Sequence, residues 1–154
     1  MIQNKKFSLV SGVSKGDNYE LTSFDSALIN AEISDYNLVK ISSILPPGYS
    51  YQEHINCCKG SFLHTAYASL TQKGTGIMSS AIAVGLPKDP MAIGVIMEHS
   101  CFHGKNISIS IVRKMVELAM YKRGIEIANI LSIGCEAELS EMFYTTTFAG
   151  IPIW

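Results

Sequence analysis

Two adjacent serines, Ser42 and Ser43, are followed within a few residues by Pro46 and Pro47. Residues 37–45 are prone to form a β-strand, and the prolines must end it because they supply no hydrogen-bond donor to a ladder. The serine pair is therefore expected at the end of a strand, beside a rigid turn. Hydroxyl groups in such a place are candidate nucleophiles. Strand-end serines also commonly do no more than satisfy local backbone groups, so the pair alone leaves both roles open.

Two carboxylates are further candidates for chemistry. Glu98 ends the apolar stretch 94–97, where burial would raise its pKa and keep it protonated near neutral pH. A solvated strand-end glutamate is the alternative. Asp25 stands three residues after Thr22, which is the spacing of a capping box at the start of a helix.

Histidine and cysteine form two short groups, which are His99, Cys101 and His103, and His54, Cys57 and Cys58. Such side chains can bind zinc or copper. Adjacent cysteines and alternate residues of a strand rarely converge on one tetrahedral ion, so no metal is predicted. The four cysteines fit neither a disulfide framework nor a CxxC pattern, and they are expected to be reduced thiols.

The 154 residues fit one domain. Hydrophobic residues make up 47% and charged residues 16%, which indicates that some apolar surface lies at subunit interfaces. The net charge of −1, without any run of Lys or Arg, gives no electrostatic footprint for nucleic acid or an anionic membrane. The chain start lacks the apolar stretch of a signal peptide and no later stretch holds eighteen uninterrupted apolar residues, so a soluble, cytoplasmic protein with a small-molecule partner is expected.

The elements that must position these groups are predicted from periodicity and turn residues. A helix is expected from Thr22 or Ser23 to about residue 34, and an amphipathic helix over 108–123, with Leu118 on its apolar face and Gly124 just beyond its end. The predicted strands cover 7–13 (with a turn at 14–18), 37–45, 61–71, 77–86, 91–98, 125–133 and 143–154. Antiparallel hairpins would join the central strands, and an acidic linker would separate the last two. This order predicts an α+β sandwich.

Several stretches of the chain match one protein family in order and spacing: residues 9–12, 23–28, 37–47, 60–62 with 65–67, 80–84 leading to 87–89, and 96–98. On these motifs the sequence resembles the pyruvoyl-dependent arginine decarboxylases, from about Phe7 to its C-terminus. The resemblance implies a four-layer α/β/β/α sandwich of the pyruvoyl-dependent histidine/arginine decarboxylase type.

The resemblance also implies that the precursor cuts itself between Ser42 and Ser43. The Ser43 hydroxyl attacks the Ser42 carbonyl, the amide becomes an ester, and elimination followed by loss of ammonia leaves a pyruvoyl group on the new chain. The single domain of residues 1–154 would then consist of a β chain, 1–42, and an α chain, 43–154, with no external cofactor. The amide-to-ester step is uphill unless strain or preorganised donors favour it.

In the mature enzyme, the resemblance implies a Schiff base between the pyruvoyl group and L-arginine, which loses carbon dioxide to give agmatine. Glu98 matches the family's proton donor. Asn37 matches a residue close to the reacting centre, and its amide could stabilise the oxyanion at the Ser42 carbonyl. An asparagine at the start of a strand also commonly just satisfies a turn.

Asp25 matches the family residue that receives the guanidinium group of the substrate, and Leu21 one that lines the same pocket. As a helix-cap partner and a hydrophobic staple, the two residues would need no such role. Ser34 and Tyr36 stand where the family usually has a small and an aliphatic residue, close to the substrate tail. A different basic amino acid is therefore the alternative substrate.

The assembly implied by the resemblance is a homotrimer or a dimer of trimers with pockets between subunits. Asp25 and Leu21 would lie on one side of each pocket, and Ser43, Asn37 and Glu98 on the other. The alternative function is that of a binding or structural subunit that never processes, but the intact serine pair, Asn37 and Glu98 argue against it.

Overall fold

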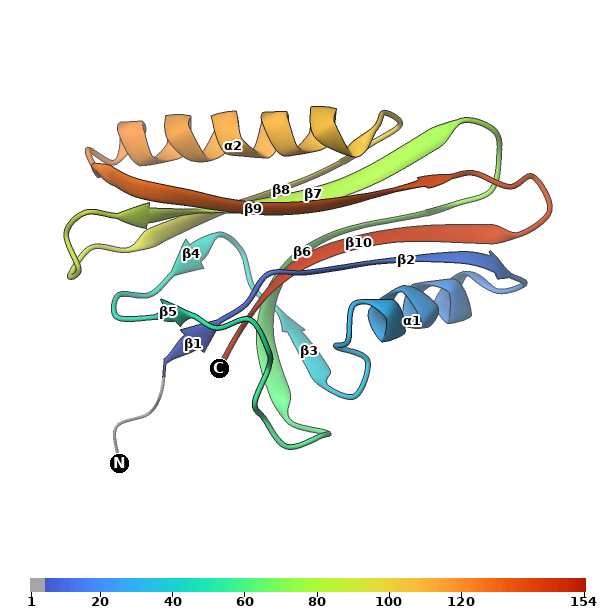
Figure 1. Cartoon of the computed structure of the whole chain (residues 1–154), viewed down its shortest axis with the longest axis horizontal. Helices are drawn as coiled ribbons and strands as arrows, with labels where there is room; N and C mark the ends of the chain where they lie inside the picture. Colours follow the sequence, from blue (N-terminus) through green and yellow to red (C-terminus); the bar gives the residue numbers. More distant parts are fainter. Residues whose placement is uncertain (1–4) are drawn as a thin grey trace.

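The computed structural model describes residues 5–154, which form two stacked β-sheets with one helix on the outer face of each (Figure 1). This arrangement confirms the expected α+β sandwich with four layers in the order α/β/β/α. No helix among these residues is long and apolar enough to cross a membrane.

The first sheet has six strands in the order β3-β6-β10-β1-β5, with β2 also paired to β10. Its strands are β1 (Lys6–Phe7), β2 (Val10–Asp17), β3 (Asn37–Lys40), β5 (Ser50–Tyr51), β6 (Phe62–Gln72) and β10 (Tyr144–Ile153). The second sheet has four strands in the order β4-β8-β7-β9. They are β4 (Ile44–Leu45), β7 (Ile77–Pro87), β8 (Gly94–Cys101) and β9 (Ile127–Glu138).

Apolar side chains fill the three spaces between the four layers. Phe7, Ile82 and Ile151 belong to the cluster between the two sheets. A second cluster joins α2 to the four-stranded sheet, and a third joins α1 to the six-stranded sheet. Because each sheet is covered on both faces, its central strands are buried along most of their length.

Helix α1 (Glu20–Asn30) begins earlier than predicted, after Tyr19, and no side chain caps it. The Thr22 hydroxyl donates to the Tyr19 carbonyl (3.0 Å) from inside the helix. The expected caps at Thr22 and Ser23 are therefore wrong, and Asp25 lies beyond the first turn, exposed, where it cannot serve in a capping box.

Helix α2 (Lys105–Lys122) matches the predicted helix but starts three residues earlier. Its buried face includes Val112, Val116 and Met120. This face is rotated from the predicted one, so Leu118 is 54% exposed. Gly124 follows the helix with a φ of 66°, a conformation that glycine adopts without strain.

Long-range pairing overrides several local turn signals. β2 continues to Asp17 through the predicted turn at 14–18, because it pairs with β10 as far as Tyr144. β9 runs through the predicted acidic linker to Glu138, which pairs with Ile77 of β7. β6 and β7 do not form the expected hairpin, because they lie in different sheets. The predicted antiparallel pairing of β7 with β8 is confirmed.

Candidate active site

Ser42 and Ser43 lie in a crossover between the two sheets and not at the end of one strand. The predicted continuous strand 37–45 is wrong because its two ends have partners in different sheets: β3 pairs with β6, and β4 with β8. On one side the Ile41 N–H donates to the Thr65 carbonyl (3.2 Å), and on the other the Ile96 N–H donates to the Ser43 carbonyl (2.8 Å). The peptide bond between the serines therefore spans the space between two anchored points.

Each sheet has an open edge next to this crossover. The β3–β6 ladder reaches only Thr65, and the ladder of β4 with β8 starts at Gly94 and ends at Val95. Beyond these points, from Ala66 in β6 and from Met97 in β8, no further strand covers the edge within residues 5–154. The serine pair thus lies at an opening in the side of the sandwich.

Glu98 projects from β8 at this opening. It follows Ile96 by two residues, so both side chains share the face of β8 that packs towards the other sheet. The side chain is 34% exposed, but its Oε2 atom is buried and has no hydrogen-bond partner among the described residues. Desolvation raises the pKa of Glu98, while the charge of Lys40 and the backbone amide of Tyr67 oppose the rise. The raised pKa expected from the sequence is confirmed.

Lys40, the last residue of β3, makes the ionic contact of this carboxyl group. Its Nζ atom lies 3.8 Å from Glu98 Oε1 and 4.4 Å from the centre of the Tyr67 ring. The sequence alone indicates no role for Lys40, although it stands three residues before Ser43. Its one signal is a charged residue between two apolar neighbours, Val39 and Ile41.

Asn37 lies at the far end of β3 from the serine pair. Its side-chain amide donates to the Gly60 carbonyl (2.9 Å). Four residues of extended chain, about 13 Å, separate it from Ile41. Within one copy of the chain, Asn37 is therefore not brought to the Ser42 carbonyl.

Asp25 and Leu21 lie on α1, which Figure 1 shows towards the opposite end of the molecule from β4. Leu21 is 77% exposed and lines a shallow cavity of about 330 Å³ with Phe24 and Thr71. Asp25 is exposed and takes part in none of the ion pairs among the described residues. One copy of the chain thus does not bring Asp25 or Leu21 to the serine pair.

Tyr36 and Ser34 follow α1 in the loop that leads to β3. The Tyr36 ring packs against the cluster under α1, and its hydroxyl donates to the Cys57 carbonyl (3.3 Å). Ser34 is half-buried. The tyrosine is thus held by the loop that carries Cys57, and this contact limits how far its ring can move towards a substrate.

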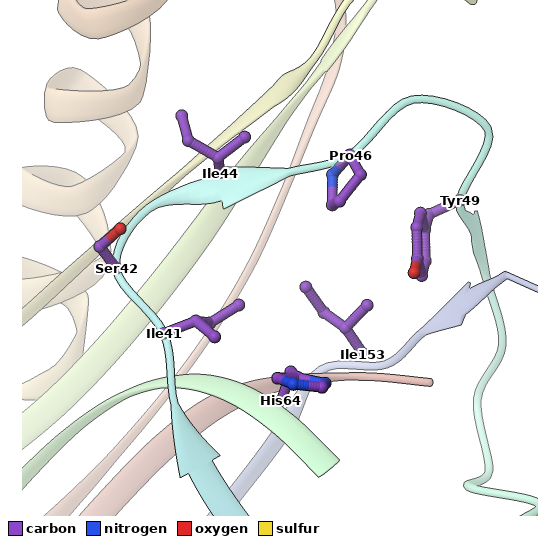
Figure 2. A pocket seen from close by; sticks show the side chains of 7 residues that line it. All are labelled: Ile41, Ser42, Ile44, Pro46, Tyr49, His64 and Ile153. Carbon is purple, nitrogen blue, oxygen red and sulfur yellow. The ribbon is translucent and has the colours of Figure 1, made fainter.

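A cavity of about 270 Å³ lies beside the crossover (Figure 2). Ser42, and not Ser43, lines it, across from Tyr49, and His64 is the only ionisable group besides that tyrosine. The remaining lining is apolar: Ile41, Ile44, Pro46 and Ile153. The cavity therefore borders the amino side of the Ser42–Ser43 bond.

The cysteine and histidine groups do not converge. Within residues 5–154, no three His, Cys, Asp or Glu side chains are placed to hold one metal ion. All four cysteines are free, and Cys135 is buried, with its thiol donating to the carbonyls of Phe148 (3.2 Å) and Gly12 (3.5 Å).

A family profile and individual relatives of known name both match this chain, and they indicate the same family. Residues 6–152 match the profile of the pyruvoyl-dependent arginine decarboxylase (PvlArgDC) family. The chain belongs to this family. A pyruvoyl-dependent arginine decarboxylase of Methanococcus aeolicus is 38% identical over 149 residues, which cover 96% of this chain and 88% of that protein. Proteins of the same name from Methanocaldococcus jannaschii and Methanopyrus kandleri are 35% and 29% identical, over 96% and 97% of this chain and 88% and 97% of theirs.

The cofactor of this pyruvoyl-dependent family is a covalent pyruvoyl group, and the residues present fit its formation at position 43. A serine stands there, with its carbonyl fixed to β8 by Ile96. Two residues further along β8, the buried Oε2 of Glu98 has no partner among the described residues and is free to act on a group bound in the opening.

Proposed function

We propose that this chain cuts itself between Ser42 and Ser43 and, as a pyruvoyl enzyme, decarboxylates L-arginine to agmatine and carbon dioxide. Membership of the family and the names of the relatives support this function. The observation that carries it is the position of the serine pair: it crosses an open side of the sandwich, tied to β8 two residues from a carboxyl group whose pKa is raised.

The crossover favours cleavage because both of its ends are anchored while the bond between them is not part of a ladder. The cut gives a β chain of residues 1–42 and an α chain of residues 43–154. The β chain keeps its place after the cut, since β2 pairs with β10 from Val10 to Asp17 and α1 buries Ala27 and Leu28.

The pyruvoyl group, once formed from Ser43, supplies the carbonyl that receives the substrate amine and the electrons released with carbon dioxide. Glu98 then delivers a proton to the former α-carbon of the substrate. Burial keeps this carboxyl protonated at higher pH than an exposed glutamate, which is what a general acid near neutral pH requires.

The remaining site residues come from a neighbouring subunit in this proposal. Asp25 is exposed and free to form paired hydrogen bonds with a guanidinium group, and Leu21 adds apolar surface beside it. Because α1 lies far from the serine pair of its own chain, a homotrimer, alone or paired into a dimer of trimers, would bring the two parts together. Asn37, Ser34 and Tyr36 would border the same interface.

Intact mass spectrometry tests the first half of the proposal. The purified protein should consist of two chains, residues 1–42 and 43–154, with the larger one blocked at its N-terminus. The Ser43→Ala variant should remain one chain of 154 residues. A single uncut wild-type chain would instead support a non-catalytic subunit.

Substrate assays test the second half. Arginine should be turned over in preference to lysine and ornithine, and Asp25→Asn should raise KM for arginine about 10-fold or more, because it replaces a charge-assisted pair with a neutral one. Glu117→Gln, a change of the same type on the exposed face of α2, is the matched control. Equal turnover of all three amino acids would point to a general decarboxylase of basic amino acids.

A further inference from the structure

We infer that Lys40 is a positioning residue for Glu98: its ammonium group, held over the Tyr67 ring, fixes the carboxyl group at the opening and controls how readily it releases its proton. The catalytic part of this inference rests on the proposed function. The contact between Lys40 and Glu98 is present in the uncut chain and can be tested there.

The position of the Lys40 side chain is defined by its backbone pairing and by an aromatic ring. β3 holds its backbone by parallel pairing of Lys40 with Thr65, and the Ile41 N–H continues this anchor. The Nζ atom lies 4.4 Å from the centre of the Tyr67 ring, within the range of a cation–π interaction. Tyr67 is fixed in turn by Phe148, whose ring centre is 5.3 Å away. The position of the charge is therefore guided by β3 and by the Tyr67 ring, although the lysine side chain remains 55% exposed.

The groups around Glu98 leave Lys40 as its one ionic partner. Of the ion pairs among residues 5–154, only that with Lys40 involves Glu98, at 3.8 Å. From β6 the carboxyl group meets the backbone amide of Tyr67, from β7 the paired residue is the apolar Ile82, and β4 adds no charged side chain. His99 follows on β8 and points to the other face of the sheet.

Cleavage gives this pair a special position. Lys40 falls on the 1–42 chain and Glu98 on the 43–154 chain, so the contact joins the two products three residues from the cut. An opposite charge favours the ionised form of a carboxyl group, while burial favours the neutral form. Lys40 thus limits the effect of burial and keeps the acid able to give up its proton.

The first test uses the uncut Ser43→Ala protein, which needs no pyruvoyl group. Glutamate labelled with ¹³C at the side-chain carboxyl is titrated by NMR, and the Glu98 signal is assigned by its loss in Glu98→Gln. Lys40→Met should move the Glu98 midpoint upwards by roughly 1 pH unit, and Lys40→Arg should leave it near its original value. Lys88→Met, which breaks an exposed ion pair with Glu126 (3.3 Å), should not move it.

The second test follows kcat against pH in the cut enzyme. A general acid must be protonated, so kcat falls as pH rises through the pKa of Glu98. Lys40→Met should shift this alkaline limb to higher pH by the same amount, with KM for arginine little changed. Lys40→Arg, which keeps the positive charge, should leave the limb in place. Its activity shows that a substitution at this position still allows the protein to fold.

The outcomes separate the two proposals. A moved midpoint in a protein that never cuts or turns over arginine would end the proposed function but support the control of Glu98 by Lys40. An active enzyme in which Lys40→Met moves neither the midpoint nor the limb would overturn the role of Lys40.

Discussion

Strand β7 and the segment from β3 to β4 are both apolar and β-prone, yet the fold uses them in opposite ways. β7 is paired with β9 along its whole length and with β8 from Ser79 to Gly85, and it is buried from Met78 to Gly85. The β3–β4 segment has two short ladders on different sheets, with the serine pair between them. In the proposed function, stability and reactivity therefore belong to different strands.

This difference shows where a chain can be cut without losing its fold. Breaking β7 would interrupt two ladders and the packing of both α2 and the space between the sheets. Breaking the Ser42–Ser43 bond removes only a crossover, because the anchors on both sides remain.

The largest expected effect is on chemistry alone. Glu98→Gln should lower kcat by about 10²- to 10⁴-fold, because the carboxyl group can no longer supply the proton. Self-cleavage should continue, as judged by intact mass. Glu117→Gln on the exposed face of α2 serves as the control, and it should leave kcat unchanged.

The next effect is on stability alone. In the uncut Ser43→Ala background, Ile82→Ala in the middle of β7 should lower the free energy of unfolding by about 3 kcal/mol, because it leaves a cavity at a fully buried site. Val39→Ala in β3, where the side chain is 39% exposed, should cost less than about 1 kcal/mol. Denaturant unfolding at one fixed protein concentration measures both. Equal costs would contradict the division between the two strands.

A third prediction concerns Gly12 of β2, over which α1 packs. A Cβ atom there would lie 2.1 Å from the Ala27 carbonyl oxygen and 2.7 Å from the Ala31 nitrogen, so Gly12→Ala must displace the helix. We expect the free energy of unfolding to fall by about 1–3 kcal/mol, as measured by thermal unfolding. Because α1 carries Asp25, KM for arginine should also rise. Lys15→Ala, an exposed change in the same strand, is the control and should cost little.

The smallest effect is the pH dependence of stability that Glu98 contributes. Its pKa is higher in the folded than in the unfolded chain, so the folded state binds more protons between the two values. The contribution of Glu98 to stability is therefore complete at low pH and is lost as pH rises through the folded pKa. Melting of Ser43→Ala with and without Glu98→Gln should show the glutamine variant gaining stability, relative to its parent, as pH rises above the ordinary pKa of a glutamate. A difference that stays constant with pH would show that burial does not shift this group.

Periodicity and turn residues predicted the four-stranded sheet's central strand and its helix well. β7 and α2 have long patterns that agree with their final pairing, so their positions were confirmed within a few residues. The errors lie where partners distant in sequence decide the structure. Nothing local distinguishes one strand over 37–45 from two short strands on different sheets, since only β6 and β8 make that difference.

The candidate site was predictable only in part for the same reason. The raised pKa of Glu98 follows from its place after an apolar run, and this is confirmed. The helix cap predicted at Thr22 and Ser23 is wrong, because the Tyr19 backbone starts α1 earlier. The contact of Lys40 with Glu98 joins residues 58 positions apart through two sheets, so no spacing rule could indicate it.

The place of β10 at the centre of its sheet sets the order of events during synthesis. β2 has no ladder partner besides β10 among the described residues. It can therefore pair only after residues 144–153 have left the ribosome. A bond broken before that moment would leave residues 1–42 held by backbone pairing only through the short β3–β6 and β1–β5 ladders. We therefore expect maturation at Ser43 to follow the synthesis of β10, which completes the six-stranded sheet.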